Sequence, residues 1–331
     1  MHYSISENIE GCEMPTGNCR LCGREADLQL SHVLPAFAYR WLRDSSGGGH
    51  IRASNVPNKR VQDGLKFYWL CTDCEECFSR SETAFAGNLF HPYLKAPGSI
   101  FPYSAWLIHF CTSVSWRVLR FYRDEGHLKA WEPEALARVD IAESVWRELL
   151  FRKRPHPGRH QQHLLPMDRI ADTTDDLAPN INRYLMRAID LDICRGTQSI
   201  FTYAKLGRLI ILGFVHEPNL NHWKGTKVHA TEGYIEPRRF AAPSALSSYL
   251  NGRARKMQSA LASMSDKQQD NVNDAIGKNI DKYVGSDAHV AIQADVEMFG
   301  SDAFANRGSV ERGQRNNFPC LNEVSVRSEG D

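Results

Sequence analysis

The sequence predicts an α+β protein with a small cysteine-containing N-terminal module and a larger mixed helical domain that carries a small antiparallel sheet. Three observations lead to this prediction. Six of the nine cysteines fall within positions 12–77, two long stretches of helical periodicity follow, and short apolar runs separated by Gly and Asn come next. We therefore expect a module over residues 1–95, an α+β domain of unknown type over 96–305, and a polar, disordered tail over 306–331.

The elements of the module follow from local signals. Residues 28–30 alternate in polarity and predict a strand that leads into Ser31 and His32. Pro35 is favoured at a helix start, so residues 36–42 are expected to be helical, with a flexible Ser/Gly loop after them. Residues 65–70 predict a second strand, which delivers Cys71 to the start of a helix over 73–86.

The larger domain begins with two predicted helices. The first carries apolar residues at helical spacing between positions 106 and 121, and the second runs from 133 to 151. Short β runs are expected around 199–203, 208–214 and 227–235. The pattern then returns to helix over 243–256 and 266–283.

Composition limits the class of function. The chain has 331 residues with 40 basic and 39 acidic side chains, a formal charge of +1, so the whole molecule is no general polyanion binder. Its apolar runs are shorter than the roughly 18–20 residues that a membrane span needs, and its start lacks the features of a signal peptide. We expect a cytoplasmic protein with no membrane partner.

The cysteine spacing predicts a metal site. Two Cys-x-x-Cys pairs, Cys19/Cys22 and Cys71/Cys74, offer four thiolates, the usual ligand set of structural zinc (Zn²⁺). Gly23 follows the first pair and suits the tight turn of such a site. Unligated core cysteines or a redox pair are the alternatives, and Cys12 and Cys77 leave a ligand exchange or a second partial site open.

The segment from Cys19 to about residue 90 resembles the HNH, or ββα-metal, endonucleases of the zinc-bearing treble-clef type. The resemblance rests on a first Cys-x-x-Cys, a strand, the motif Ser31-His32-Val33-Leu34-Pro35, a long loop, and a second Cys-x-x-Cys that opens a helix. It covers just over a fifth of the chain. The family motif is Asp-His-x-x-Pro, so this chain resembles a Ser-His-x-x-Pro variant.

The resemblance implies a role for three residues. His32 matches the general base that activates water for attack on a phosphodiester. Glu75, directly after Cys74, takes the place of a metal-binding His or Asn, and Asp63 is our choice for a further metal ligand or orienting residue. A catalytic Mg²⁺ or Mn²⁺ would be held by these oxygens. Ser31 replaces a metal-binding carboxylate, so another carboxylate compensates or the site is inactive.

These observations predict a metal-dependent HNH-type endonuclease, and a phage-defence or restriction-like context follows by analogy with the family. Three other interpretations stay open. The module is a catalytically inactive zinc knuckle that binds nucleic acid or a protein, or it is a redox protein that uses Cys71, Cys74 and Cys77. The third interpretation gives these residues a structural role: His32 only contacts the backbone, and the glutamates of the helix over 73–86 only complement the dipole of that helix.

Basic side chains suggest where nucleic acid binds. Arg152, Lys153, Arg154 and Arg159 form a short basic segment, and three arginines at 117, 120 and 123 extend it along a helix. A solvated linker also explains such a segment, and Trp223, which could stack on a base, equally suits a core position. The predicted partner is nucleic acid, with DNA ranked before RNA, and a protein partner is expected at the larger domain.

Overall fold

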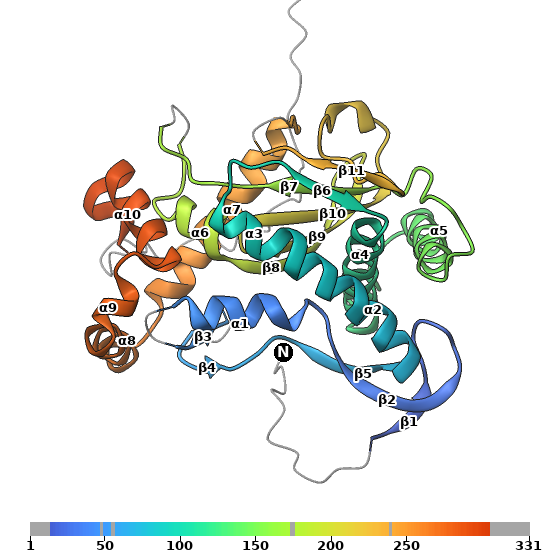
Figure 1. The fold of residues 1–331 in the computed structure, drawn as a ribbon, viewed down its shortest axis with the longest axis horizontal. Coiled ribbons are helices and arrows are strands. Elements are labelled where there is room, and N and C mark those ends of the chain that lie inside the picture. Colours follow the sequence, from blue (N-terminus) through green and yellow to red (C-terminus); the bar gives the residue numbers. More distant parts are fainter. Residues whose placement is uncertain (1–13, 47–48, 54–56, 173–175, 238–239, 305–331) are drawn as a thin grey trace, which may run out of the picture.

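The structure is a computed structural model that describes residues 14–46, 49–53, 57–172, 176–237 and 240–304 (Figure 1). The predicted tail over 306–331 and Cys12 lie outside these residues.

Helices and strands alternate irregularly along the chain. The α-helices are α1 (Ala36–Asp44), α2 (Thr72–Phe85), α3 (His91–Lys95), α4 (Trp106–Asp124), α5 (Pro133–Leu150), α6 (Ile181–Arg187), α7 (Ser244–Ala262), α8 (Asp266–Lys278), α9 (Ile280–Tyr283) and α10 (Asp287–Phe299). The short helices are η1 (π, Ala86–Phe90), η2 (3₁₀, Leu220–His222) and η3 (3₁₀, Gly300–Ala303). The strands are β1 (Thr16–Asn18), β2 (Glu25–His32), β3 (Ile51–Arg52), β4 (Arg60–Val61), β5 (Lys66–Cys71), β6 (Phe101–Ser104), β7 (Gln162–Pro166), β8 (Ile189–Arg195), β9 (Ile200–Leu206), β10 (Leu209–His216) and β11 (Glu232–Ile235).

The N-terminal module is built on an antiparallel sheet of order β1-β2-β5. Leu28 lies opposite Cys71 in this sheet, and His32 lies opposite Lys66. This register brings together the two ends of the segment that connects the first Cys-x-x-Cys pair, or knuckle, to the second. The predicted order of strand, helix, strand and helix is confirmed by β2, α1, β5 and α2, and the treble-clef name for this arrangement stays a prediction.

The second sheet has the order β7-β10-β9-β8, and all of its neighbours are antiparallel. Successive residues of a strand point to opposite faces, and both faces are buried here. Ile211 and Val215 of β10 pack in one cluster with α4, whereas Leu212 and Phe214 pack in another with α6 and α7. Burial on both faces explains why β10 is apolar throughout its length, which is what made it recognisable in the sequence.

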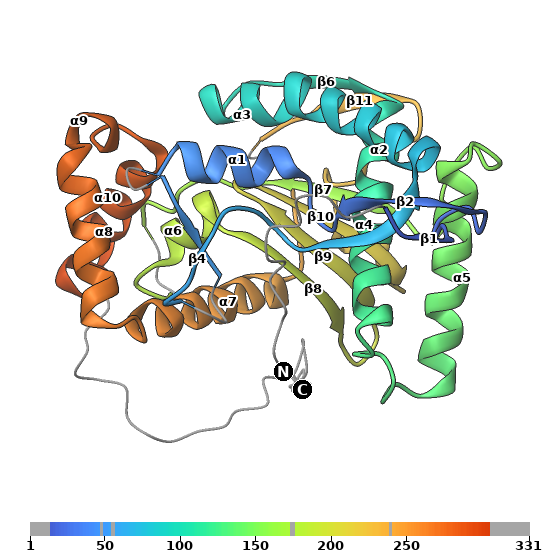
Figure 2. The same ribbon diagram turned by 90° about the horizontal axis from the view of Figure 1, so that it is seen from below.

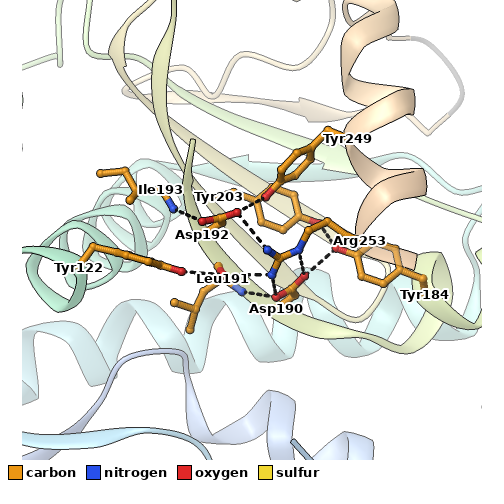
Figure 3. A network of polar contacts seen from close by, with 9 residues as sticks. All are labelled: Tyr122, Tyr184, Asp190, Leu191, Asp192, Ile193, Tyr203, Tyr249 and Arg253. Carbon is orange, nitrogen blue, oxygen red and sulfur yellow. Dashed lines mark hydrogen bonds and ion pairs between the residues drawn. The ribbon is translucent and has the colours of Figure 1, made fainter. Parts of the chain in front are cut away.

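A polar network fastens α7 to the edge strand β8 (Figure 3). The Arg253 guanidinium forms ion pairs with Asp190, whose Oδ2 lies 2.7 Å from Nε, and with Asp192, whose Oδ2 lies 3.0 Å from Nη1. Tyr184 donates a hydrogen bond to Asp190 at 2.8 Å, and Tyr249 donates one to Asp192 at 2.9 Å. Each carboxylate therefore has both a cationic and a hydroxyl partner.

Several boundaries differ from the sequence prediction. Of the run 227–235, only Glu232–Ile235 forms a strand, and it pairs with β6 and not with the four-stranded sheet. The helix predicted over 266–283 is divided at Asn279 into α8 and α9. The helix α4 is buried on nearly all sides, including its polar Thr112 and Ser115. It lies between α2, α5 and the large sheet (Figure 2). The apolar spacing between positions 106 and 121 predicted one buried face, whereas the helix is covered on several sides.

One hydrophobic cluster includes residues from both sides of position 95. Phe37, Phe85 and Phe90 of the module pack with Phe110 of α4, and the same cluster continues to Ile211 of the large sheet. The predicted units 1–95 and 96–305 therefore share a core. Within the described ranges, no helix is both long enough and apolar enough to cross a membrane.

Candidate metal centre and the neighbouring histidine

The two Cys-x-x-Cys pairs meet as predicted. The sulfur atoms of Cys19, Cys22, Cys71 and Cys74 all lie within 4.8 Å of one another. Those of Cys22 and Cys71 are 3.8 Å apart, which is the S–S separation of about 3.8 Å expected for tetrahedral zinc with Zn–S bonds of about 2.3 Å. Four thiols that converge in this way can hold one metal ion, and the geometry is consistent with structural zinc.

Local backbone geometry explains how the pairs converge. Gly23 has a φ of +80°, a conformation that favours glycine, and its amide donates to the Cys19 carbonyl at 2.8 Å to close the first knuckle. The amide of Arg20 donates to the Trp69 carbonyl at 2.7 Å, so the first knuckle is tied to β5. The second pair begins at the last residue of β5 and continues on the first turn of α2.

Arg24 is a component of this site that the sequence analysis missed. Its guanidinium lies 3.5 Å from the Cys22 sulfur and 3.7 Å from the Cys71 sulfur, and it pairs with Asp73 at 2.6 Å. Burial raises the pKa of Cys22, but hydrogen bonds from Arg24, and to a smaller extent from Cys19 and Cys71, together outweigh it and lower the pKa to about 6. Burial raises the pKa of Cys19 and of Cys74. A bound cation would stabilise all four thiolates.

Cys77 does not belong to the four-sulfur group. It lies one helical turn beyond Cys74 on α2 and is half-buried. Cys71, Cys74 and Cys77 form no disulfide with one another. The convergence of Cys71 and Cys74 on the first knuckle favours metal binding over a redox pair with Cys77.

His32 forms a close pair with Asp63. The imidazole Nε2 lies 2.8 Å from Asp63 Oδ2, and Lys66 Nζ lies 2.8 Å from the same oxygen. The Gly64 amide donates to Asp63 Oδ1 at 2.9 Å. Burial raises the pKa of Asp63, but these donors outweigh it and hold the pKa well below its usual range. A charged carboxylate thus orients the imidazole, as a base requires.

Glu75 does not join this pair. It accepts a hydrogen bond from the buried Ser31 hydroxyl at 2.6 Å. Over the described residues, the four cysteines are the one group of three or more His, Cys, Asp or Glu side chains that could hold a metal ion. Lys66 already neutralises Asp63, so His32, Asp63 and Glu75 as arranged do not fit a Mg²⁺ or Mn²⁺ site. The catalytic metal stays a prediction without structural support.

Arg117 fixes the backbone behind His32. Its guanidinium donates to the His32 carbonyl at 3.1 Å and pairs with Glu82 at 2.7 Å. Its side chain is only 2% exposed, so the prediction that it contacts phosphate is wrong. Arg120 and Arg123 pair with carboxylates on α4 and α5, which leaves no basic track along this helix.

The predicted basic segment begins directly after α5. Arg152, Lys153 and Arg159 are exposed, while Arg154 pairs with Glu148 at 2.9 Å. Lys153 helps to line a cavity of about 370 Å³ beside the first knuckle, together with Cys22, Arg24, Ser144, Arg147, Glu148 and Phe151. Trp223 is 5% exposed, which favours the core interpretation over base stacking.

No protein-family model, curated protein or solved structure gives a significant match to this chain.

Proposed function

We propose that this protein is a zinc-stabilised endonuclease of the HNH type that hydrolyses phosphodiester bonds of nucleic acid. The observation that carries the proposal is the contact of 2.8 Å between Asp63 and His32, the last residue of the strand that follows the first Cys-x-x-Cys pair. Zinc is the proposed ion of the four-cysteine site, and the cytoplasm is the proposed location because its reducing conditions keep thiols available for a metal.

In this proposal His32 is the general base. Donation from Nε2 to Asp63 leaves the lone pair on Nδ1, and no hydrogen bond occupies Nδ1 among the described residues. Nδ1 can therefore accept a proton from water. Asp63 holds the ring in this tautomer and balances the positive charge that forms on it. Because the oxygen ligands do not converge, we assign no step to a divalent ion.

The proposal is tested with a cleavage assay on plasmid DNA and on single-stranded RNA, with and without Mg²⁺ or Mn²⁺. We expect His32→Ala to lower the cleavage rate by about 10²–10⁴-fold, the usual contribution of a general base. Asp63→Asn should lower it as well. His222→Ala is the matched control, since His222 is exposed on η2 and far along the chain from the knuckles. Zinc content is followed in every variant.

Equal cleavage by the wild type and His32→Ala at equal zinc content would remove His32 from the mechanism. Cleavage of neither nucleic acid by a folded, zinc-loaded protein would favour the second candidate function, an inactive zinc-knuckle module that binds nucleic acid or a protein. A specific observation supports that candidate. Glu75 accepts a hydrogen bond from Ser31, and it forms no metal-binding group with His32 and Asp63. A phage-defence or restriction-like context remains an analogy with the family.

A further inference from the structure

Two arginines lie directly opposite each other in the strand pair β3–β4, which occupies the long loop between the knuckles. Arg52 of β3 and Arg60 of β4 are register partners. Like charges that face each other across two strands destabilise the pair, and the opposite choice of charge would stabilise it. The chain therefore keeps an arrangement here that folding alone disfavours.

His50 lies beside the two arginines. An Arg60 guanidinium nitrogen lies 3.2 Å from His50 Nε2, and His50 Nδ1 is buried with no hydrogen-bond partner. Burial and the charges of Arg60 and Arg52 all lower the pKa of His50. Both charged groups that act on this histidine are thus cations.

No carboxylate neutralises this group in the described part of the chain. The Arg52 guanidinium donates to the Pro57 carbonyl at 3.0 Å and to the Gln268 side chain at 3.2 Å, and both of these partners are uncharged. Arg60 is exposed, and among the described residues its side chain forms a hydrogen bond with His50 and no ion pair. The neighbouring Lys59 is exposed as well. By contrast, Arg120 and Arg123 of α4 each contact two carboxylates. The uncompensated charge at β3–β4 is complementary to an anion with several charges.

The strand pair leads directly to the candidate base. Arg60 precedes Asp63 by three residues, and Lys66 follows Asp63 by three more. Asp63 contacts both His32 and Lys66. A polyanion that lies along β4 would therefore extend toward the His32–Asp63 pair.

We propose that Arg52 and Arg60 of the β3–β4 pair, together with the adjacent His50 and Lys59, form the surface that binds the phosphate backbone of nucleic acid. This inference rests on the proposed function in naming nucleic acid as the partner, and it assigns a contact surface distinct from the segment Arg152–Arg159. Backbone contacts of this kind position a strand without reading its sequence.

The test measures binding in a His32→Ala background, so that loss of cleavage and loss of binding are separate results. The probes are a fluorescein-labelled 20-base-pair DNA duplex and a single-stranded 20-nucleotide RNA, titrated by anisotropy at several salt concentrations without added divalent ions. Each phosphate contact with duplex DNA contributes about 0.9 to the slope of log affinity against log salt. Arg52→Gln/Arg60→Gln should therefore weaken DNA binding by about tenfold or more and reduce this slope by about 2.

The control variant is Arg138→Gln/Arg255→Gln, which changes the net charge equally at two partly exposed arginines that have acidic partners. The proposal is overturned if Arg52→Gln/Arg60→Gln loses no more DNA affinity than this control and reduces the salt dependence of binding by no more than this control does. Inorganic phosphate at the same phosphate concentration should not displace the duplex. Displacement as effective as that by unlabelled duplex would make the group a site for free phosphate, contrary to the proposal.

A charge reversal separates a ligand-binding role from a structural one. Arg60→Glu places an acid opposite Arg52, so the melting temperature should rise by about 1–2 °C while nucleic-acid binding falls. If Arg60 stabilised the fold instead, the same variant would melt at a lower temperature and keep its affinity.

Discussion

Arg117 of α4 and the main chain of His32 are joined by a hydrogen bond of 3.1 Å, although the two residues are 85 positions apart in the sequence. The same guanidinium pairs with Glu82 of α2 and lies 5.2 Å from the centre of the Phe78 ring. The helices α2 and α4 thus meet behind the candidate base, which lies at the end of β2.

Replacement of Arg117 should therefore be costly. Arg117→Met keeps the approximate volume but leaves Glu82 and the His32 carbonyl without their donor. We expect the free energy of unfolding to fall by about 3 kcal/mol, because one partner of a mostly buried ion pair is left alone. Urea unfolding at pH 7 measures this change. Arg138→Met, whose pair with Glu134 is largely exposed, should cost less than about 1 kcal/mol, and an equal loss in both variants would contradict the argument.

The metal site predicts a difference between two nearby cysteines. Cys74→Ser removes a ligand and should abolish stoichiometric zinc, whereas Cys77→Ser should retain about one zinc per chain. Elemental analysis of the purified proteins gives the ratio. Chelation of the wild type should also destabilise the module, since structural zinc contributes on the order of 10 kcal/mol in small zinc-dependent folds. Loss of zinc from Cys77→Ser would place Cys77 among the ligands.

Two arginines on α7 should differ strongly in their contribution to stability. Arg253→Met leaves Asp190 and Asp192 facing each other without their cation, and we expect a loss of about 3 kcal/mol in urea unfolding. Arg255 lies two residues further along and pairs with the highly exposed Asp176. Its replacement by Met should change stability by less than about 1 kcal/mol. A small effect at Arg253 would show that the network in Figure 3 contributes little to the docking of α7.

Lys205 should make stability depend on pH. Its side chain is fully buried and donates to the carbonyls of Leu185 and Gly207. Burial lowers the pKa of Lys205 from 10.5 to about 7. Between these two values the unfolded chain binds more protons than the folded chain, so stability should rise with pH at about 1 kcal/mol per pH unit.

The check is urea unfolding of the wild type and Lys205→Met between pH 7 and pH 9. The wild type should gain stability relative to the variant as the pH rises, because the protonated amine is the disfavoured form in the fold. A constant difference between the two proteins would show that Lys205 stays protonated over this range.

The sequence predicted the parts of the fold that depend on local signals. Pro35 marked the start of α1, and the paired cysteines marked both knuckles. The continuous apolar run of β10 was recognised because both of its faces are buried. The pairing of β11 with β6 was not predicted, since it joins segments more than 120 residues apart and neither sequence specifies its partner.

The candidate site was also predicted only in part, because the sequence reports local spacing and not tertiary contacts. Spacing alone was sufficient to group the four cysteines, but contacts that depend on tertiary packing were missed. Arg24 gave no signal beyond its position after Gly23, although its guanidinium reaches two of the sulfurs. Arg117 was interpreted as a surface charge because helical spacing reports which residues share a face and not whether a second helix covers that face.

The aromatic cluster that joins the module to α4 limits how the protein can be divided. Phe85 stacks on Phe110 with ring centroids 3.8 Å apart, and Phe37 and Phe90 pack around them. A fragment cut at residue 95 would expose these rings to water and should aggregate even with its zinc in place. The smallest useful expression fragment must therefore extend through α4, and a zinc-knuckle segment transplanted to another protein would need a replacement for Phe110.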